Sequence, residues 1–180
     1  MNKKVKIGLL IGILIVIFIV GIVMLLAINT KSIDVKLDKN YKALIGIEVN
    51  SKIILVINQK DKVSNIIYLN DESVNSLANQ RIEGKDIPTA IELIIDKLKN
   101  NNEFNHKEDL NIIKYEDNGI YSNIIQELNK QFVIYGIDSK INEKNLNIND
   151  KLNELDIETG INTKENLVKL DEYSKNNLSK

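Results

Sequence analysis

The chain has 180 residues, of which 43% are hydrophobic and 27% are charged, and its formal net charge is −1. Because it contains no cysteine, disulfides and thiolate chemistry are excluded, and a folded domain must be stabilised by packing alone. All 25 acidic residues follow residue 28, so the larger part of the chain is mildly acidic, which argues against a nucleic-acid partner.

The first predicted element is a transmembrane helix, Ile7 to Ile28, with the sequence IGLLIGILIVIFIVGIVMLLAI. No charged residue interrupts it, and about 20 apolar residues are enough to cross the hydrocarbon core of a bilayer. A buried core helix seldom stays apolar on every face over such a length. The run is also longer than the apolar region of a cleaved signal peptide, and no A-x-A pattern follows it. We therefore predict an uncleaved signal-anchor.

The charges that flank this span predict its orientation. Lys3, Lys4 and Lys6 precede it, whereas only Lys31 follows it closely. By the positive-inside rule, residues 1–6 form a cytoplasmic stub, and everything beyond the span lies outside the cell membrane. The sequence therefore predicts a single-pass membrane protein with an extracytoplasmic domain.

Two glycines in the span, Gly8 and Gly12, stand in GxxxG spacing. This spacing allows two transmembrane helices to approach closely, which would pair the span with a second copy of itself. Small residues are common in transmembrane helices for other reasons, so self-association through this face and a span without a helical partner both stay open.

Beyond a polar juxtamembrane linker, residues 29–43, the pattern changes to that of strands. Apolar residues alternate with polar or small ones over 45–49, which is typical of a half-buried strand. The continuous run IILVI at 53–57 predicts a central strand, and a third strand follows at 63–69. Because the connections between these strands are short, we expect an antiparallel meander.

Helices follow the third strand. Asn70 or Asp71 is suited to cap a short helix, because the side-chain oxygen of either residue can accept a backbone N–H of the first turn. Pro88 suits the first turn of the next helix, where its missing N–H is not needed. Apolar residues three and four positions apart give that second helix a single apolar face, and Asn100 to Asn102 ends it.

In the last part of the predicted domain, strands and helices alternate. A strand is expected at 110–115 and a helix at 120–128. A final strand is predicted from four apolar residues, Phe132, Ile134, Ile137 and Ile141. Two short helices then close the domain, with Gly160 as the C-cap of the first. The sequence therefore predicts an α+β domain over 44–172, an antiparallel sheet with packed helices, preceded by one transmembrane helix and followed by a polar tail, 173–180.

Two motifs give this domain a resemblance to a known family. The first is Glu48-Val49-Asn50-Ser51, and the second is Tyr68-Leu69-Asn70-Asp71-Glu72. The middle domain of the RsgI family of membrane-anchored anti-sigma factors has Asp-Val-Asn-Pro-Ser and Leu-Asn-Asp/Glu at matching spacing. The helix from Pro88 and the stretch Asp156 to Leu170 are similar to later parts of that domain, in the same order. The chain thus resembles the extracytoplasmic RsgI-like middle domain with its membrane anchor.

The resemblance implies a regulatory or structural role at a bacterial envelope, in sensing, relaying or binding, and not an enzyme that turns over small molecules. A membrane-tethered subunit whose partner supplies the activity is a second class that stays open. The expected partners are the membrane and either an envelope protein or a second copy of the chain. The family's cytoplasmic anti-sigma domain has no counterpart in residues 1–6, so we expect no direct binding of a sigma factor.

The resemblance also singles out the bond between Asn50 and Ser51, because the family has an Asn-Pro bond there that is thought to cleave itself. Two routes are open. The Asn50 side-chain nitrogen can attack its own carbonyl carbon, or the Ser51 hydroxyl can attack the preceding carbonyl. Either route needs a bond distorted between two rigid strands. Serine in place of proline removes the family's leaving group, and a plain polar turn is the alternative interpretation.

The sequence predicts no metal site and no cofactor. His106 is the only histidine and lies in a polar run, so we expect it at the surface. Asn145, Asn147 and Asn149 alternate as the ligands of an EF-hand loop do. That loop needs a leading aspartate, which is missing here, and a glycine at the position where Asp150 stands.

Overall fold

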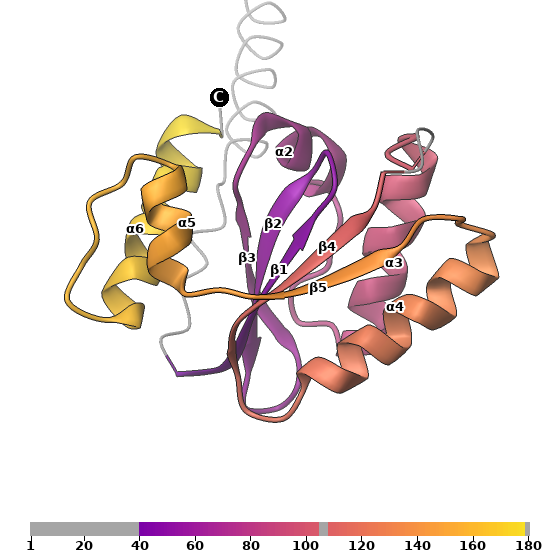
Figure 1. The fold of residues 1–180 in the computed structure, drawn as a ribbon, viewed down its shortest axis with the longest axis horizontal. Helices are drawn as coiled ribbons and strands as arrows, with labels where there is room; N and C mark the ends of the chain where they lie inside the picture. The colour runs from indigo at the N-terminus through magenta and orange to yellow at the C-terminus, as the bar shows by residue number, and fades with distance from the viewer. Residues whose placement is uncertain (1–39, 105–107, 179–180) are drawn as a thin grey trace, which may run out of the picture. The chain divides into compact units, whose positions relative to one another are not determined.

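A five-stranded sheet with the order β3-β2-β1-β4-β5 is the centre of the computed structural model, which describes residues 40–104 and 108–178 (Figure 1). The strands are β1 (Tyr41–Glu48), β2 (Lys52–Asn58), β3 (Val63–Tyr68), β4 (Leu110–Asp117) and β5 (Ile141–Asn145). The predicted antiparallel meander of β1, β2 and β3 is confirmed, and β4 pairs antiparallel with the other side of β1. The first strand of the domain is therefore the central strand of the sheet.

Some predictions fall outside the described residues. These are the span Ile7–Ile28 with Gly8 and Gly12, the linker up to residue 39, and His106. The described residues all belong to one compact unit, Leu37–Lys180. Within 40–104 and 108–178, no helix is both long enough and apolar enough to cross a membrane.

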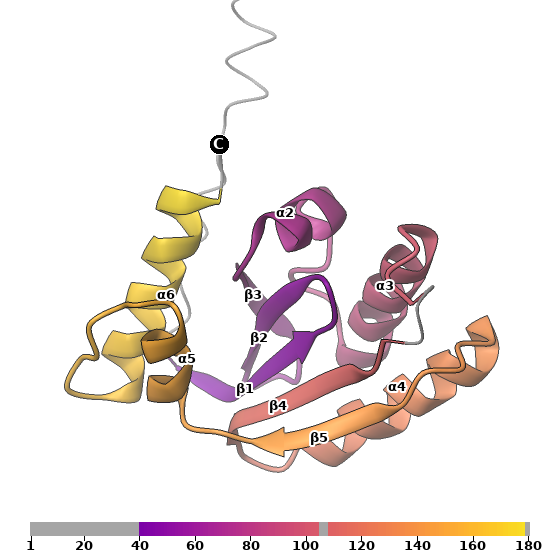
Figure 2. The same cartoon turned by 45° about the horizontal axis from the view of Figure 1, so that its top comes forward.

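Helices cover both faces of the sheet. On one face lie α2 (Asp71–Leu77), α3 (Ile87–Asn100) and α4 (Tyr121–Tyr135), and on the other lie α5 (Ile148–Glu154) and α6 (Thr163–Asn177). Figures 1 and 2 show these two layers on opposite sides of the strands. The domain is thus an α+β structure, as the sequence predicts, and its elements form three layers.

The strand β1 shows why the sheet can be buried on both sides. Ala43, Ile45 and Ile47 face the α2–α3–α4 layer, whereas Leu44 faces α5 and α6. The same alternation divides the run 53–57 of β2, whose five residues are at most 1% exposed. A strand covered on both faces has a continuous apolar sequence. This run was predicted to be a central strand, and β2 is indeed an inner strand, next to the central strand β1.

The prediction of a purely antiparallel sheet is wrong for its last strand. The strand β5 pairs parallel with β4, because the helix α4 connects the two and crosses over the sheet between them. The predicted strand through Phe132 and Ile134 is also wrong. Both residues belong to α4, which continues to Tyr135 and ends at Gly136 in the left-handed conformation, with φ 61°.

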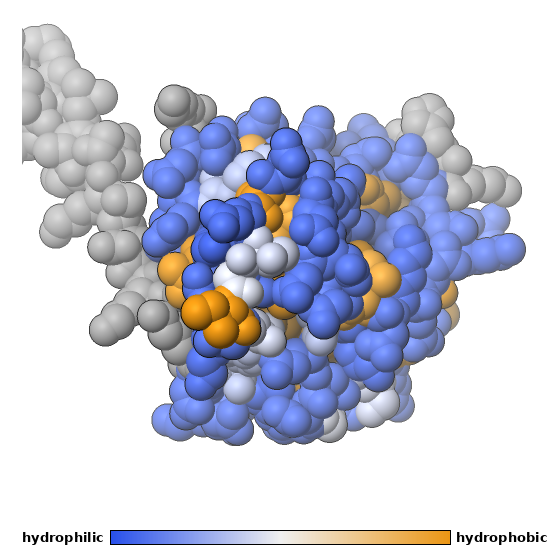
Figure 3. All heavy atoms as spheres, turned by 60° about the vertical axis from the view of Figure 1, so that its left-hand side comes forward, coloured by the Kyte–Doolittle hydropathy of each residue, from blue (hydrophilic) through white to orange (hydrophobic). Residues whose placement is uncertain are grey.

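The closing helices differ from their predicted ends. The helix α5 ends at Glu154 with Leu155 at its C-cap, so Gly160 is not a cap. Instead, Gly160 lies in the loop before α6, where its N–H donates to Asn166 Oδ1 at 2.5 Å. A Cβ at Gly160 would lie 2.5 Å from Glu165 Cδ, so the loop passes close to the first turn of α6. Figure 3, turned toward the side that carries α5 and α6, shows a largely hydrophilic surface with small separate apolar patches.

Candidate functional site

The two residues that the sequence singles out lie in the tight connection between β1 and β2. Glu48 pairs with Lys52 across the hairpin, so Val49, Asn50 and Ser51 form the connection. Asn50 is exposed, whereas Ser51 is 2% exposed. The backbone of both residues is outside the left-handed region, so this turn carries no strain of that kind. The distorted bond that self-cleavage was expected to need is therefore not visible in these dihedral angles.

A buried carboxylate, Glu103, accepts two hydrogen bonds from Ser51. Its Oε2 accepts the Ser51 backbone N–H at 2.8 Å, and its Oε1 accepts the Ser51 Oγ–H at 2.7 Å. The Ser76 hydroxyl of α2 also donates to Oε1, at 2.8 Å. Glu103 is 6% exposed, and a carboxylate can be buried at this low exposure because its oxygens accept three hydrogen bonds.

The end of α3 explains how Glu103 reaches the hairpin. After Asn100, Asn102 adopts the left-handed conformation with φ 63°, and the Glu103 N–H donates to Leu98 O at 3.0 Å. The Asn102 N–H donates to Lys99 O, which completes a Schellman-type end. Asparagine tolerates the left-handed conformation better than most residues, which favours the end of the helix at this position. Because Glu103 follows Asn102 directly, this helix end also determines where the Glu103 carboxylate lies.

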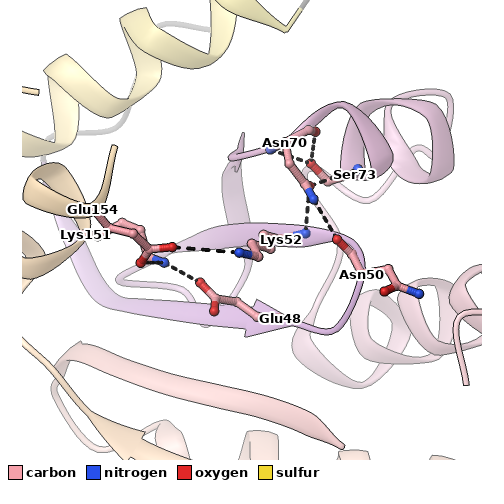
Figure 4. Close-up of polar contacts among 7 residues, drawn as sticks. All are labelled: Glu48, Asn50, Lys52, Asn70, Ser73, Lys151 and Glu154. Carbon is pink, nitrogen blue, oxygen red and sulfur yellow. Dashed lines mark hydrogen bonds and ion pairs between the residues drawn. The ribbon is translucent and has the colours of Figure 1, made fainter. Parts of the chain in front are cut away.

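Asn70 holds the other side of the same bond. Its Nδ2 donates to the Asn50 carbonyl oxygen at 2.6 Å, and its Oδ1 accepts the Lys52 N–H at 3.0 Å. The same Oδ1 accepts the Ser73 N–H at 3.2 Å, so Asn70 is also the N-cap of α2, as predicted. Because two backbone N–H groups face Oδ1, the amide orientation is fixed, with Nδ2 toward Asn50 (Figure 4).

Asn50 itself takes part in this network only through its backbone. In Figure 4 its carbonyl oxygen points to Asn70, whereas its side chain extends away from Asn70 and Lys52. Ser51, in contrast, has both its N–H and its hydroxyl on Glu103. Of the two residues predicted for self-cleavage, the structure therefore places only Ser51 against a group able to accept a proton.

An ion-pair network ties the base of the hairpin to α5. Lys151 Nζ lies 2.7 Å from Glu48 Oε1 and 2.5 Å from Glu154 Oε2, and Lys52 Nζ lies 3.8 Å from Glu154 Oε1 (Figure 4). The Lys151 side chain is 2% exposed. Burial lowers the pKa of Lys151, but hydrogen bonds to Glu154 and Glu48 outweigh burial and raise this pKa above its ordinary value.

The tyrosine that packs beside this network also has a perturbed pKa. Burial, together with the nearby Glu48, Glu154 and Asp150 carboxylates, raises the pKa of Tyr115. Its hydroxyl is buried and has no hydrogen-bond partner among the described residues. Gly46 of β1 makes room for this ring, because a Cβ there would lie 3.0 Å from Tyr115 Cε2. Tyr115 is therefore neutral at physiological pH and packs as a large apolar side chain.

A pocket of about 550 Å³ opens beside the hairpin, and its wall includes Asn50, Asn70 and Glu103. The pocket therefore gives solvent access to the Asn50 side of the Asn50–Ser51 bond, whereas Ser51 itself is buried. Chemically, the arrangement places the Ser51 hydroxyl next to the Glu103 carboxylate, and the Asn70 amide donates to the Asn50 carbonyl oxygen. The same contacts also serve as hairpin-stabilising hydrogen bonds, which is the plain polar-turn interpretation.

The asparagine run that resembles an EF-hand loop has a different role. Asn147 caps α5 by accepting the Asn149 N–H at 2.9 Å, while Asp150 accepts the Asn147 N–H at 3.1 Å. The Asn149 side chain accepts a hydrogen bond from Asn166 of α6. Among the described residues no group of three or more His, Cys, Asp or Glu side chains is arranged to hold a metal ion.

Sequence reasoning missed Glu103 and Ser76, and it assigned Asn70 only to helix capping. Glu103 lies 52 residues from Ser51 along the chain, and no local pattern predicts that contact. A signal existed for Asn70, because it belongs to the second motif of the RsgI resemblance and Asn50 belongs to the first. The structure brings those two motifs together through the Asn70–Asn50 hydrogen bond.

No protein-family model matches the chain, and no curated protein sequence matches it.

Proposed function

We propose that this chain is a single-pass membrane protein that presents an extracytoplasmic sensing or interaction domain at a bacterial envelope. The apolar stretch 7–28 and the lysines before it support the anchor and its orientation. The resemblance of the domain to the RsgI middle domain supports a regulatory role linked to anti-sigma signalling. A tethered structural subunit of an envelope complex is the nearest alternative.

The observation that carries this proposal is the position of β1. It is the first described element after the predicted anchor, and it is also the central strand, paired with β2 on one side and β4 on the other. A tether attached to a central strand transmits a pull directly to the core of the domain. A tether attached to an edge strand would load only one row of hydrogen bonds.

Protease added outside intact protoplasts tests the topology. We expect it to digest the domain, while a cytoplasmic control protein stays intact. Replacing Lys3, Lys4 and Lys6 by glutamine should weaken this orientation, since the flanking charge asymmetry is then lost. A domain that stays protected in the wild type contradicts the proposed localisation. A secreted form without residues 1–28 tests the regulatory role, because signalling through a tether is then lost whereas binding of a soluble partner is retained.

A second candidate function is self-cleavage between Asn50 and Ser51, and one observation favours it. Polar groups contact both sides of this bond, with Asn70 Nδ2 on the Asn50 carbonyl oxygen and Glu103 on the Ser51 hydroxyl and N–H. Denaturing electrophoresis of the full chain, purified in detergent, tests it. Self-cleavage gives two pieces, 1–50 and 51–180, whereas a single full-length band shows that the hairpin is a turn only.

A further inference from the structure

We infer that the Asn50–Ser51 bond is broken by the serine route, with Glu103 as the proton-transferring group and Asn70 as the donor to the oxyanion. This inference rests on the proposed self-cleavage and assigns its mechanism. It is carried by three contacts of the described residues: Ser51 Oγ to Glu103 Oε1 at 2.7 Å, Ser51 N to Glu103 Oε2 at 2.8 Å, and Asn70 Nδ2 to Asn50 O at 2.6 Å.

The first step is an attack by Ser51 on the carbonyl carbon that precedes it. Glu103 Oε1 takes the proton of the Ser51 hydroxyl while Oγ forms a bond to the Asn50 carbonyl carbon. The electron pair of the carbonyl moves to its oxygen, which becomes an oxyanion in a five-membered ring. Asn70 Nδ2 already donates to this oxygen, so the developing charge has a donor in place without any rearrangement.

The second step breaks the bond between the Asn50 carbonyl carbon and the Ser51 nitrogen. The oxyanion reforms its carbonyl, and the electron pair of the broken bond stays on nitrogen, which takes the proton that Glu103 accepted. The same carboxyl group contacts both the hydroxyl and the nitrogen, so one residue moves the proton from the first to the second. The product is an ester between Asn50 and Ser51 Oγ with a free amine, and no atom has been gained or lost.

Water then completes the reaction. Its oxygen attaches to the Asn50 carbonyl carbon as the new carboxyl group, and a hydrogen returns to Ser51 Oγ, so one water is consumed for each chain cut. The pocket of about 550 Å³ gives solvent a path to this carbonyl. The shift to the ester is uphill because an ordinary amide is more stable than an ester. No left-handed backbone angle marks strain at Asn50 or Ser51, so the irreversible hydrolysis of the ester supplies the driving force that a distorted bond would otherwise give.

The competing asparagine route has no comparable support. It needs the Asn50 side-chain nitrogen to lose a proton and reach its own carbonyl carbon. That side chain is exposed and extends away from the labelled polar groups around the bond in Figure 4. Glu103 contacts the serine side of the bond instead. The geometry therefore favours oxygen over nitrogen as the nucleophile.

Cell-free synthesis of the full chain into phospholipid vesicles gives the time course of cleavage for each variant. We expect Ser51→Ala to abolish cleavage, Asn50→Ala to retain it, and Ser51→Cys to retain it, because a thiol can replace the hydroxyl. Glu103→Gln should slow cleavage by about 10² to 10⁴-fold, the usual range for a lost proton-transfer group. Asn70→Ala should slow it by about 10² to 10³-fold, as for a lost oxyanion donor.

Two matched controls lie in the wall of the same pocket. Glu72→Gln makes the same chemical change as Glu103→Gln, and Asn75→Ala makes the same change as Asn70→Ala, but both residues are exposed. We expect both to cleave at the wild-type rate. Hydroxylamine added to the wild type should capture the ester as a hydroxamate at Asn50. This readout does not depend on the folding of any variant.

The outcomes separate the mechanism from the function on which it rests. If the wild type and Ser51→Ala are both cut but Asn50→Ala is not, self-cleavage is retained as a function and the serine route is overturned. If Glu103→Gln cleaves as fast as Glu72→Gln, the role of Glu103 is overturned. If wild type gives a single full-length chain, both self-cleavage and this mechanism fail, and the tethered domain remains.

Discussion

Lys151 shows at the residue scale how the hairpin is held to the opposite helical layer. Its 2% exposed side chain bonds Glu48, which is 13% exposed, and Glu154. We expect Lys151→Met to lower the free energy of unfolding by about 3 kcal/mol, because Glu48 is then left partly buried without its cation. Lys130→Met is the control: Glu127 is also 13% exposed, but Lys130 is 60% exposed and Glu127 keeps the hydrogen bond from Gln131 Nε2, so the loss of Lys130 should cost only about 0.5 kcal/mol. Urea unfolding of Leu37–Lys180 measures both, and equal costs would contradict a stabilising network.

The same network predicts a pH dependence. The pKa of Glu154 is raised by burial but lowered more by its bonds with Lys151, and it lies below its ordinary 4.5. Its contribution to stability is therefore complete above pH 4.5 and is lost as the pH falls through the lowered pKa. The pKa of Lys151 lies above 10.5, so its contribution is complete below pH 10.5 and is lost as the pH rises through the raised pKa. The stability difference between wild type and Lys151→Met should stay constant from about pH 5 to about pH 10 and shrink outside that window. A difference that changes near pH 7 would show that other groups control it.

At the element scale, each helical layer is tested by one buried side chain. Ile94 of α3 and Leu170 of α6 are both 0% exposed, on opposite faces of the sheet. Each change to alanine should cost about 2 to 5 kcal/mol, whereas Val133→Ala on α4, at 82% exposure, should stay within about 0.5 kcal/mol. Since the two residues belong to separate core clusters on opposite faces of the sheet, the loss of stability in the double variant should equal the sum of the two single losses within about 0.5 kcal/mol. Denaturant unfolding decides this, and a double variant that costs much less than the sum would show that one layer unfolds separately.

The elements also show which parts of the fold could be predicted. Short-range patterns were sufficient for β1, β2, β3, β4, α2 and α3, because period-two alternation and capping residues are local signals. They also predicted the first half of α4, at 120–128, but failed in its second half, where Phe132 continues the helical spacing of Ile124 and Leu128 and was assigned to a strand. Gly136 was the missed local signal, since a glycine in the left-handed conformation commonly ends a helix. The parallel pairing of β5 followed from that error.

The candidate site also has a part that the sequence predicted and a part that it did not. Asn50 and Ser51 were predicted from a turn between two strands and from a resemblance. The groups that give Ser51 its environment come from the end of α3 and from α2, and their approach depends on how the helices pack on the sheet. Such long-range contacts leave no periodic trace in a single sequence. Only the left-handed position of Asn102, a common feature of helix ends, has a local cause.

At the scale of the whole domain, the position of β1 predicts what a cut in the hairpin would do. The strand keeps its registers with both neighbours, and Leu44, Ile45 and Ile47 stay buried when the connection at Asn50–Ser51 is broken. A pull on its N-terminal end then loads two rows of hydrogen bonds together along the strand axis. A cut domain should therefore stay on its tether until force or denaturant removes β1.

This last prediction can be tested whether or not the chain cleaves itself. A protease recognition sequence replacing 49–51 allows the connection to be cut in the folded protein. We expect the two pieces to elute together in size-exclusion chromatography in native buffer and to separate in urea, because release of β1 requires the shared core to open. A second variant with Leu44→Ala in the same cut protein should separate at lower urea, since Leu44 is 0% exposed and packs against the α5–α6 layer. Pieces that separate in native buffer would show that β1 is held mainly by its covalent connection, and that a cut alone would shed the domain without any force.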